Sequence, residues 1–275
     1  MQGVARRAAR KYIAGPKLQD ALATASRLRT RGFATTLGYW NAADEAPARI
    51  LEQYRDALSR LAKLPSPERH ISIKYPALSY LRPLAEVLLK EALTAGFRVH
   101  LDSLWPESVD PTWTLLQEAG ARGPEIGFTL PGRWRRSPAD AERCTELGLS
   151  IRVVKGQWAD PADPDRDARA GYLEVIDRLA GRASHVGVAT HDAWLAEQSL
   201  QKLQHSRTRC ELELLYGLPS RKLFALAGRT GVSIRVYVPY GEAFLPYCLG
   251  QTLRRPRLIA QLLRDLFSLD IRSRE

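Results

Sequence analysis

The sequence has no long apolar run and few cysteines. Its apolar stretches are much shorter than the roughly 20 residues that a membrane-spanning helix needs, so we expect no integral membrane segment. The first residues, MQGVARRAARKYIAG, lack the apolar core of a secretory signal. Cys144, Cys210 and Cys248 stand far apart among apolar neighbours, as expected of buried thiols in a reducing compartment. These absences predict a cytoplasmic protein.

Several short catalytic motifs are also missing. His70, His100 and His191 do not have the paired spacing of a zinc site, and no carboxylate cluster accompanies them, so we expect no metal. The chain contains no P-loop and no serine nucleophile elbow. No Gly-rich dinucleotide fingerprint follows the first expected strand, which argues against a Rossmann fold.

Acidic residues are fewer than basic ones. The chain has 41 Lys and Arg against 30 Asp and Glu, a formal net charge of +11. No zinc-finger spacing, RNA-binding strand motif or basic heptad accompanies the arginines, so we expect no nucleic-acid partner. Two interpretations remain: an arginine-rich surface without a dedicated partner, or a surface that meets an acidic one, such as a carrier protein or an anionic membrane surface.

Five short β-like runs carry polar side chains at every second position. They are residues 70–74, 98–102, 149–154, 210–214 and 233–237. Because strand side chains alternate between two faces, the apolar set packs outward and the polar set converges on the other side. Five such runs in order, separated by helical stretches, predict a barrel with a polar, filled lumen.

Strand and helix patterns alternate along the whole chain. The strands are expected at 33–37, 70–74, 98–102, 126–129, 149–154, 185–189, 209–214 and 233–238. The helices are expected at 46–63, 82–95, 111–119, 138–147, up to 179, 193–203, 219–227 and 244–267. Eight such units without a domain break favour an α/β fold of the (β/α)₈ TIM-like type. We predict an N-terminal helical arm over 1–32 and the barrel over 33–275.

In such barrels the reacting groups lie at the carboxyl ends of the strands. The groups expected there are Lys74, Asp102, Arg152, Lys155, Thr190, His191, Glu213 and Tyr237. Arg152 is the most informative, because a guanidinium inside a strand keeps its charge and must meet an anion or an electron-rich partner. Two interpretations stay open: an internal salt bridge to Glu211 or Glu213, or a cation that faces a cofactor which becomes anionic on reduction.

Three further features bear on a possible ligand, and the last two have two interpretations each. Lys155 and Gly156 make a tight turn that suits a phosphate, although the pair is a weak signal. Residues 190–192 lie before a helix, where backbone N–H groups favour phosphate, or Asp192 simply caps the helix and His191 is exposed. Lys74 and Asp102 either form a structural bridge across the lumen or border a substrate with an amine or carboxylate.

Six segments together resemble the proline dehydrogenase family of flavoprotein barrels. In order, they are ISIKYPAL, VHLDSLWPES, IRVVKGQW, VATHD, ELELLYGL and VYVPYGEAFLPY. The match covers nearly the whole chain. The resemblance implies a distorted (β/α)₈ barrel that holds FAD non-covalently at the strand ends. It also implies oxidation of the C–N bond of proline by hydride transfer to the flavin, which gives an imine.

The resemblance assigns roles to individual residues. The expected catalytic residues are Arg152, which would face flavin N5, with Asp102 and Lys74. The expected cofactor-binding residues are Ser103, Pro131, Arg152, Lys155, Gly156, Gln157, Thr190 and His191. The expected substrate-binding residues are Lys74, Tyr247, Gly250 and Gln251.

Four positions depart from the family pattern. The family's last helix carries an arginine pair that holds the substrate carboxylate, and this chain has Gly250 and Gln251 there. Arg254 stands where the family has an acid, and Pro131 replaces a glutamine that hydrogen-bonds the flavin. Losing two charge-assisted hydrogen bonds would cost roughly 3–6 kcal/mol of binding to a free carboxylate.

These departures lead to two hypotheses about function. The first is a FAD-dependent oxidoreductase whose small-molecule substrate is a bulkier amine or imino acid, or a proline whose carboxylate is masked as an ester, amide or carrier thioester. An acidic carrier protein would then suit the basic surface. The electron acceptor, whether a quinone, another protein or oxygen, is not indicated. The second is a non-catalytic binding barrel that has lost FAD.

Overall fold

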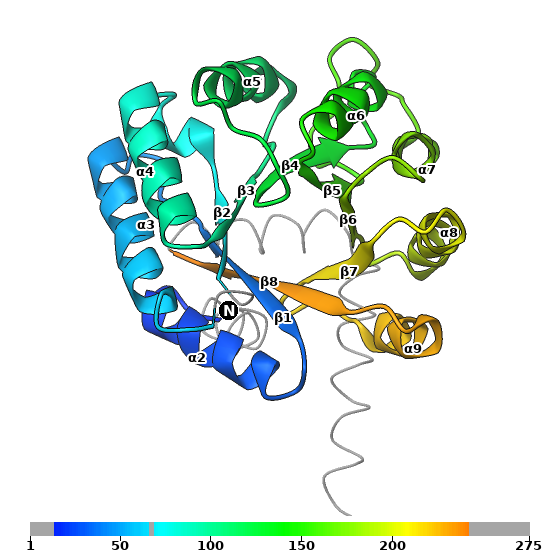
Figure 1. Ribbon diagram of the computed structural model, residues 1–275, viewed down its shortest axis with the longest axis horizontal. Coiled ribbons are helices and arrows are strands. Elements are labelled where there is room, and N and C mark those ends of the chain that lie inside the picture. Colours follow the sequence, from blue (N-terminus) through cyan, green and yellow to red (C-terminus); the bar gives the residue numbers. More distant parts are fainter. Residues whose placement is uncertain (1–13, 66–68, 242–275) are drawn as a thin grey trace, which may run out of the picture.

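Eight parallel strands close into a barrel. The computed structural model describes residues 14–65 and 69–241. The strands are β1 Ala34–Tyr39, β2 His70–Ile73, β3 Arg98–Leu101, β4 Ile126–Pro131, β5 Ser150–Val154, β6 His185–Ala189, β7 Cys210–Leu215 and β8 Ile234–Tyr240. Each strand pairs with the next, and β8 pairs with β1 to close the circle (Figure 1). The predicted (β/α)₈ fold is confirmed.

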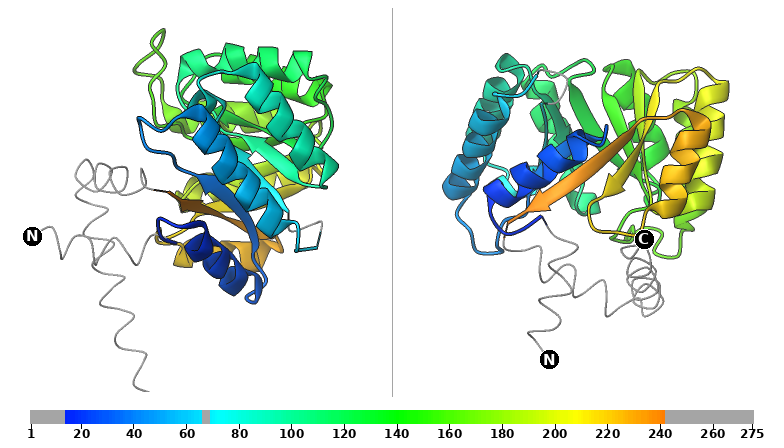
Figure 2. Two further views of the ribbon diagram at one scale, coloured as in Figure 1. Left: turned by 90° about the vertical axis from the view of Figure 1, so that its left-hand side faces the viewer. Right: turned by 90° about the horizontal axis from the view of Figure 1, so that it is seen from below.

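Helices surround the barrel. They are α2 Leu18–Arg29, α3 Pro47–Leu61, α4 Arg82–Thr94, α5 Val109–Glu118, α6 Ser137–Glu146, α7 Ala168–Leu179, α8 Ala193–His205 and α9 Arg221–Thr230. Figure 2 shows them on the outside of the strands. Helix α2, which belongs to the predicted arm 1–32, contacts β1 and β8 and lies in the ring between α9 and α3 (Figure 1). It therefore covers the seam where the barrel closes. The helix expected at 244–267 lies outside the described residues.

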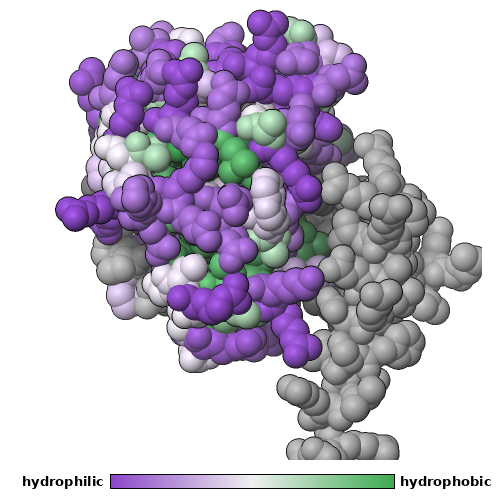
Figure 3. Space-filling model, turned by 90° about the vertical axis from the view of Figure 1, so that its right-hand side faces the viewer, coloured by the Kyte–Doolittle hydropathy of each residue, from purple (hydrophilic) through white to green (hydrophobic). Residues whose placement is uncertain are grey.

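Hydrophobic spacing explains how the helices pack. In α3, the residues Ile50, Tyr54, Leu58 and Leu61 recur at helical spacing and are all buried. Their outer faces are polar, and the surface beside α7–α9 is mainly hydrophilic with small apolar patches (Figure 3). No helix within the described parts of the chain is long and apolar enough to cross a membrane.

The strands alternate as the sequence predicts. Ile151 and Val153 of β5 belong to the apolar core, whereas Arg152, between them, is a buried charged residue. Three strands are longer than expected: β1 continues to Tyr39, β4 to Pro131 and β8 to Tyr240. The reason is pairing, because β1 stays in register with β8 along its whole length and β4 with β5 up to Pro131.

Three strand glycines make room for polar side chains in the lumen. A Cβ atom on any of them would lie about 2 Å from a side-chain atom of another strand. The pairs are Gly38 with the Tyr237 hydroxyl at 1.9 Å, Gly127 with His100 Nδ1 at 2.1 Å, and Gly187 with Glu213 Oε1 at 2.1 Å. Glycine within a strand thus permits the close approach that a crowded barrel interior requires.

Candidate active site

Arg152 lies at the centre of a buried ion network. Its Nε donates to Glu213 Oε2 at 2.6 Å, and its Nη1 donates to Asp102 Oδ1 at 2.9 Å. The three side chains are 5%, 6% and 14% exposed, respectively, for Arg152, Glu213 and Asp102. Burial opposes the charge of Arg152, but the two acids outweigh it and raise the guanidinium pKa. The predicted internal salt bridge to Glu213 is therefore present.

One donor of this guanidinium remains unused. Arg152 Nη2 is buried and has no hydrogen-bond partner within residues 14–65 and 69–241. A buried unpaired donor on a charged group is costly, and most such groups in proteins find a partner. The ion network therefore does not exclude an anion or an electron-rich group beside Arg152, because Nη2 is still available to donate a hydrogen bond to it.

Tyr237 and Trp40 extend the network beyond Asp102. The Tyr237 hydroxyl donates to Asp102 Oδ2 at 3.0 Å, and Trp40 Nε1 donates to the Tyr237 hydroxyl at 3.3 Å. Burial and the nearby Asp102 carboxylate raise the pKa of Tyr237 well above its ordinary value. The Arg152 guanidinium carbon also lies 5.4 Å from the Tyr237 ring centroid. Tyr237 thus stays protonated and fixes Asp102 through the carboxylate oxygen that Arg152 does not bond.

Lys74 is buried near the same end of the barrel. Its Nζ donates to the Tyr39 carbonyl at 2.6 Å and lies 5.4 Å from the Trp40 ring centroid. Burial lowers the pKa of Lys74 to about 8, although the Asp102 carboxylate opposes this shift. No ion pair joins Lys74 to Asp102 in the described parts of the chain, so the interpretation as a structural bridge is wrong. Lys74 Nζ is instead bonded to the Tyr39 carbonyl, while Asp102 accepts from Arg152 and Tyr237.

The turn after β5 contains three predicted cofactor ligands. Gly156 has φ +92°, and a Cβ there would approach Pro131 Cβ to 3.0 Å. The backbone conformation at position 156 and its contact with Pro131 therefore already require glycine, without any ligand. Lys155 Nζ lies 3.6 Å from Asp192 Oδ2, and the Gln157 carbonyl accepts from Arg133 Nη1 at 3.2 Å.

The other predicted cofactor ligands lie on neighbouring strand ends. Ser103 donates its hydroxyl to the Thr129 carbonyl at 2.7 Å. Pro131 ends β4, and its carbonyl accepts from the Ser137 hydroxyl at 2.6 Å. Thr190 is buried at the end of β6, where its Oγ1 accepts from the backbone N–H of Asp192.

His191 is held by the backbone on both sides. The Leu215 N–H donates to Nε2 at 2.9 Å, which leaves Nδ1 to donate to the Pro219 carbonyl at 3.2 Å. Burial lowers the pKa of His191, in keeping with a neutral ring. The expectation that His191 is exposed was wrong, because the loop after β7 packs on it. Capping by Asp192 is confirmed, since its Oδ1 accepts from Leu195 N–H.

Comparison with known proteins identifies relatives along nearly the whole chain. Proline dehydrogenase 1 of Bacillus subtilis subsp. natto is 24% identical over 94% of this chain and 90% of its own length. Proline dehydrogenase of Deinococcus radiodurans is 25% identical over 94% of this chain and 89% of its own. The chain is thus similar to proline dehydrogenases along nearly its whole length. No family model matches it.

A solved structure shows the same fold. The chain of proline utilization A (PutA) from Bdellovibrio bacteriovorus superimposes with a TM-score of 0.77 at 17% identity. The match covers 90% of this chain and 32% of the PutA chain, so this protein spans about a third of that relative. At this identity the likeness concerns the barrel architecture alone.

The described barrel brings together some of the predicted site residues. Lys74, Asp102 and Arg152 lie at one end, linked through Tyr237 and Trp40. Lys155, Thr190 and His191 surround the turns after β5 and β6. The predicted substrate ligands Tyr247, Gly250 and Gln251, with Arg254 and Cys248, lie outside the described residues.

Two contributors were missed in the sequence. Tyr39 ends the first strand and Trp40 follows it, and they contact Lys74 and Tyr237 respectively. The available signal was Gly38, a glycine inside a strand, which indicates close approach of another chain segment. The strand expected at 33–37 carries no ionisable side chain, so its sequence gives no sign of a role in the site.

Proposed function

We propose that this protein is a FAD-dependent oxidoreductase that oxidises a C–H bond next to nitrogen in a proline-like amine or imino acid derivative. The observation that carries the proposal is Arg152. Its position is fixed by Asp102 and Glu213, and its buried Nη2 has no partner in the described parts of the chain. The similarity to proline dehydrogenases supports the same reaction class.

The residues present fit FAD. The unpaired Nη2 of Arg152 would donate to the flavin ring, and Lys155 would add a positive charge for phosphate. Ser103, Gly156, Gln157, Thr190 and His191 would complete the cofactor site. Pro131, which has no N–H or side-chain donor, contributes shape only. When bound, FAD would supply the two-electron acceptor for hydride transfer.

The chain's own residues would orient the substrate and stabilise charge. Asp102 is a rigid anion near the reacting end, where it would attract the substrate nitrogen. Lys74, with a pKa of about 8, holds its proton weakly and would help set the protonation state of that nitrogen. Arg152 would stabilise negative charge that develops beside it.

The substrate would differ from free proline. Gly250 and Gln251 provide no cation for a carboxylate, and Gly250 also leaves more space. Weakening by roughly 3–6 kcal/mol corresponds to a loss of about two to four orders of magnitude in affinity. The proposed substrates are therefore bulkier, or their carboxylate is masked as an ester, an amide or a thioester on an acidic carrier protein.

The first experiment tests the cofactor. The purified wild-type protein should show flavin absorbance, and Arg152→Met should bind flavin at least tenfold more weakly. Arg235→Met is the matched control, since it removes a buried arginine that pairs with Glu211 in the same lumen. A colourless wild-type protein that also fails to bind added FAD would contradict the proposal.

The second experiment tests the substrate class. Free proline, proline methyl ester and prolinamide would be compared by anaerobic bleaching of the flavin. We expect the masked compounds to bleach it at least tenfold more efficiently than proline. Restoring the arginine pair with Gly250→Arg and Gln251→Arg should shift the preference towards free proline. Efficient oxidation of free proline by the wild type would refute the masked-substrate proposal and leave the reaction class intact.

A non-catalytic binding barrel is the second candidate. The observation in its favour is that Asp102 and Glu213 already neutralise Arg152 without any cofactor. It predicts a folded protein that binds no flavin and a stable apo-protein in which Arg152→Met has no effect other than on stability.

A further inference from the structure

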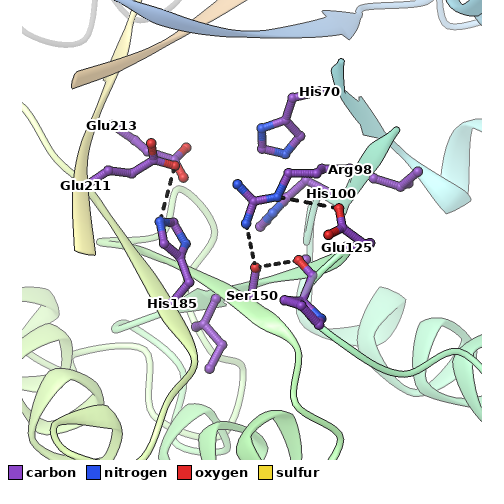
Figure 4. Close-up of a pocket in the computed structure, with 12 residues that line it drawn as sticks. His70, Arg98, His100, Glu125, Ser150, His185, Glu211 and Glu213 are labelled. Atoms are coloured by element: carbon purple, nitrogen blue, oxygen red, sulfur yellow. Dashed lines mark hydrogen bonds and ion pairs between the residues drawn. The ribbon is translucent and has the colours of Figure 1, made fainter. Parts of the chain in front are cut away.

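A small polar cavity lies at the amino-terminal end of the lumen. Its volume is about 10 Å³, close to the least that holds one water molecule. It is lined by His70, Arg98, Val99, His100, Pro124, Glu125, Gly127, Ser150, Ile151, His185, Glu211 and Glu213. Figure 4 shows several of these side chains pointing towards one another. Of the residues in the ion network of the proposed site, only Glu213 lines this cavity among the described residues.

Glu213 belongs both to this cavity and to the ion network of the proposed site. It lines the cavity, and its Oε2 accepts from Arg152 Nε at 2.6 Å. Gly187 makes this position available, because a Cβ there would meet Glu213 Oε1 at 2.1 Å. Glu213 is thus the carboxylate that both lines the amino-terminal cavity and bonds Arg152.

The cavity has groups that can accept a proton at its rim and in its interior. At the rim, the Glu125 side chain is 59% exposed. Further in, His185 Nε2 lies 3.6 Å from Glu211 Oε1 (Figure 4). One water molecule in the cavity would connect this set to Glu213. The arrangement therefore offers a route for a proton between solvent and the lumen.

The fixed charges of the lumen balance without any ligand. Among the described residues, the buried cations are Lys74, Arg152 and Arg235, and the acids beside them are Asp102, Glu211 and Glu213. Three positive and three negative groups leave no net charge when all are ionised. A negative charge added beside Arg152 would be uncompensated in a medium of low dielectric constant. Protonation of one acid would restore the balance.

Of the two acids on β7, Glu213 is the one poised to accept that proton. Burial raises its pKa, and Arg152 and Arg235 only partly oppose this while Glu211 adds to it. Tyr172 of α7 lies close enough for the charge of Glu213 to raise the pKa of its hydroxyl. For Glu211 burial acts in the same direction, but Arg235 and His185 lower its pKa below the ordinary value. Glu211 therefore stays ionised.

We propose that Glu213 takes up one proton, through the amino-terminal cavity, when oxidation of the substrate places negative charge beside Arg152. The inference rests on the proposed function. In the proposed reaction the substrate would give a hydride, a proton with two electrons, to FAD, and its nitrogen proton would go to solvent. One proton from solvent adds to the Glu213 carboxylate. The lumen therefore has the same net charge before and after the reaction, and reoxidation of the flavin releases the proton again.

The test measures the flavin midpoint potential against pH in the holoenzyme. The potential should fall with pH more steeply in the wild type than in Glu213→Gln. The expected difference is about 30 mV per pH unit, the value for one additional proton per two electrons. Glu125→Gln is the matched control at the exposed rim and should keep the wild-type slope. Glu211→Gln should keep the same number of protons and move the steep region to lower pH.

Infrared difference spectra provide an independent measurement if Glu213→Gln does not fold. Reduction of the wild-type holoenzyme should produce the carbonyl band of a protonated carboxylic acid, shifted in D₂O. Equal potential slopes in the wild type and in Glu213→Gln, or no such band, would overturn the inference. Failure of the proposed function is distinguishable, because then no flavin is bound and no potential exists to measure.

Discussion

The two ends of the barrel lumen contain the same kinds of residue and use them differently. At the amino-terminal end, Arg235 donates from Nε to Glu211 at 2.7 Å and from Nη1 to the Thr35 carbonyl at 3.1 Å. None of its donors is both buried and unpaired in the described residues, whereas Arg152 Nη2 at the other end is. A structural ion pair thus consumes its donors, and a site for a ligand leaves one unused.

The two ends of the lumen also contain groups that titrate in different pH ranges, one acidic and one mildly alkaline. Burial lowers the pKa of His185, at the amino-terminal end, to about 4. Burial lowers the pKa of Lys74, at the carboxyl end, to about 8. At neutral pH the first group is neutral and the second is mostly charged. Acid therefore perturbs the amino-terminal end, and mild alkali perturbs the proposed site.

The largest effect is expected from removing either arginine. Arg152→Met leaves Asp102 and Glu213 without their cation, and Arg235→Met does the same to Glu211. Each should lower the free energy of unfolding by about 3–5 kcal/mol, the usual cost of breaking a buried ion pair from one side. Urea unfolding measures this. Only Arg152→Met should weaken flavin binding; equal loss of flavin in a folded Arg235→Met would abolish the distinction between the ends.

The next effect concerns acid stability. His185 has a folded pKa of about 4 against an unfolded value near 6.5, so the unfolded chain binds more protons between these values. Stability should therefore fall as pH falls from 6.5 to 4, by up to about 3 kcal/mol from this group. His185→Asn should flatten the unfolding free energy in this window. An unchanged slope would show that other groups control the acid response of this end.

Much of the fold could be predicted because its signals are local. Period-two alternation identified the polar lumen, and helical spacing such as that of Ile50, Tyr54 and Leu58 identified the outer layer. The helix α2 was expected as an arm, yet it completes the ring of helices. Its role depends on where β8 meets β1, a contact between residues 200 positions apart that no local pattern encodes.

The site could be predicted only in its residue types. Arg152, Asp102 and Lys74 were expected at strand ends, and they lie there. The pairing among these three residues could not be predicted. Whether Asp102 bonds Lys74 or Arg152 depends on distances across the lumen, and it bonds Arg152. The fixed ring of His191 depends likewise on the loop after β7. Pairing in a barrel interior is a three-dimensional property that strand periodicity does not contain.

A third, smaller effect should follow from filling the space at Gly38. In Gly38→Ala the new Cβ would overlap the Tyr237 hydroxyl and push it off Asp102. The expected loss of stability is about 1–3 kcal/mol, as for other overpacked interiors, with weaker flavin binding as a further consequence. Gly228→Ala is the matched control, since a Cβ there meets nothing within 4 Å and the residue lies in helix α9. Similar losses in both variants would mean that the lumen is not specifically crowded at Gly38.

The smallest effect expected is a pH dependence of turnover that originates in Lys74. With a pKa of about 8, its amine changes from mostly charged at pH 7 to mostly neutral at pH 9. A charged Lys74 competes with a cationic substrate nitrogen for the field of Asp102, so kcat/KM should rise by about tenfold over this range, equivalent to about 1.4 kcal/mol. Lys74→Met should lose this limb while the titration of the substrate amine, common to both proteins, remains. If both proteins rise alike, the limb belongs to the substrate, and Lys74 acts at this end of the barrel only through its bond to the Tyr39 carbonyl.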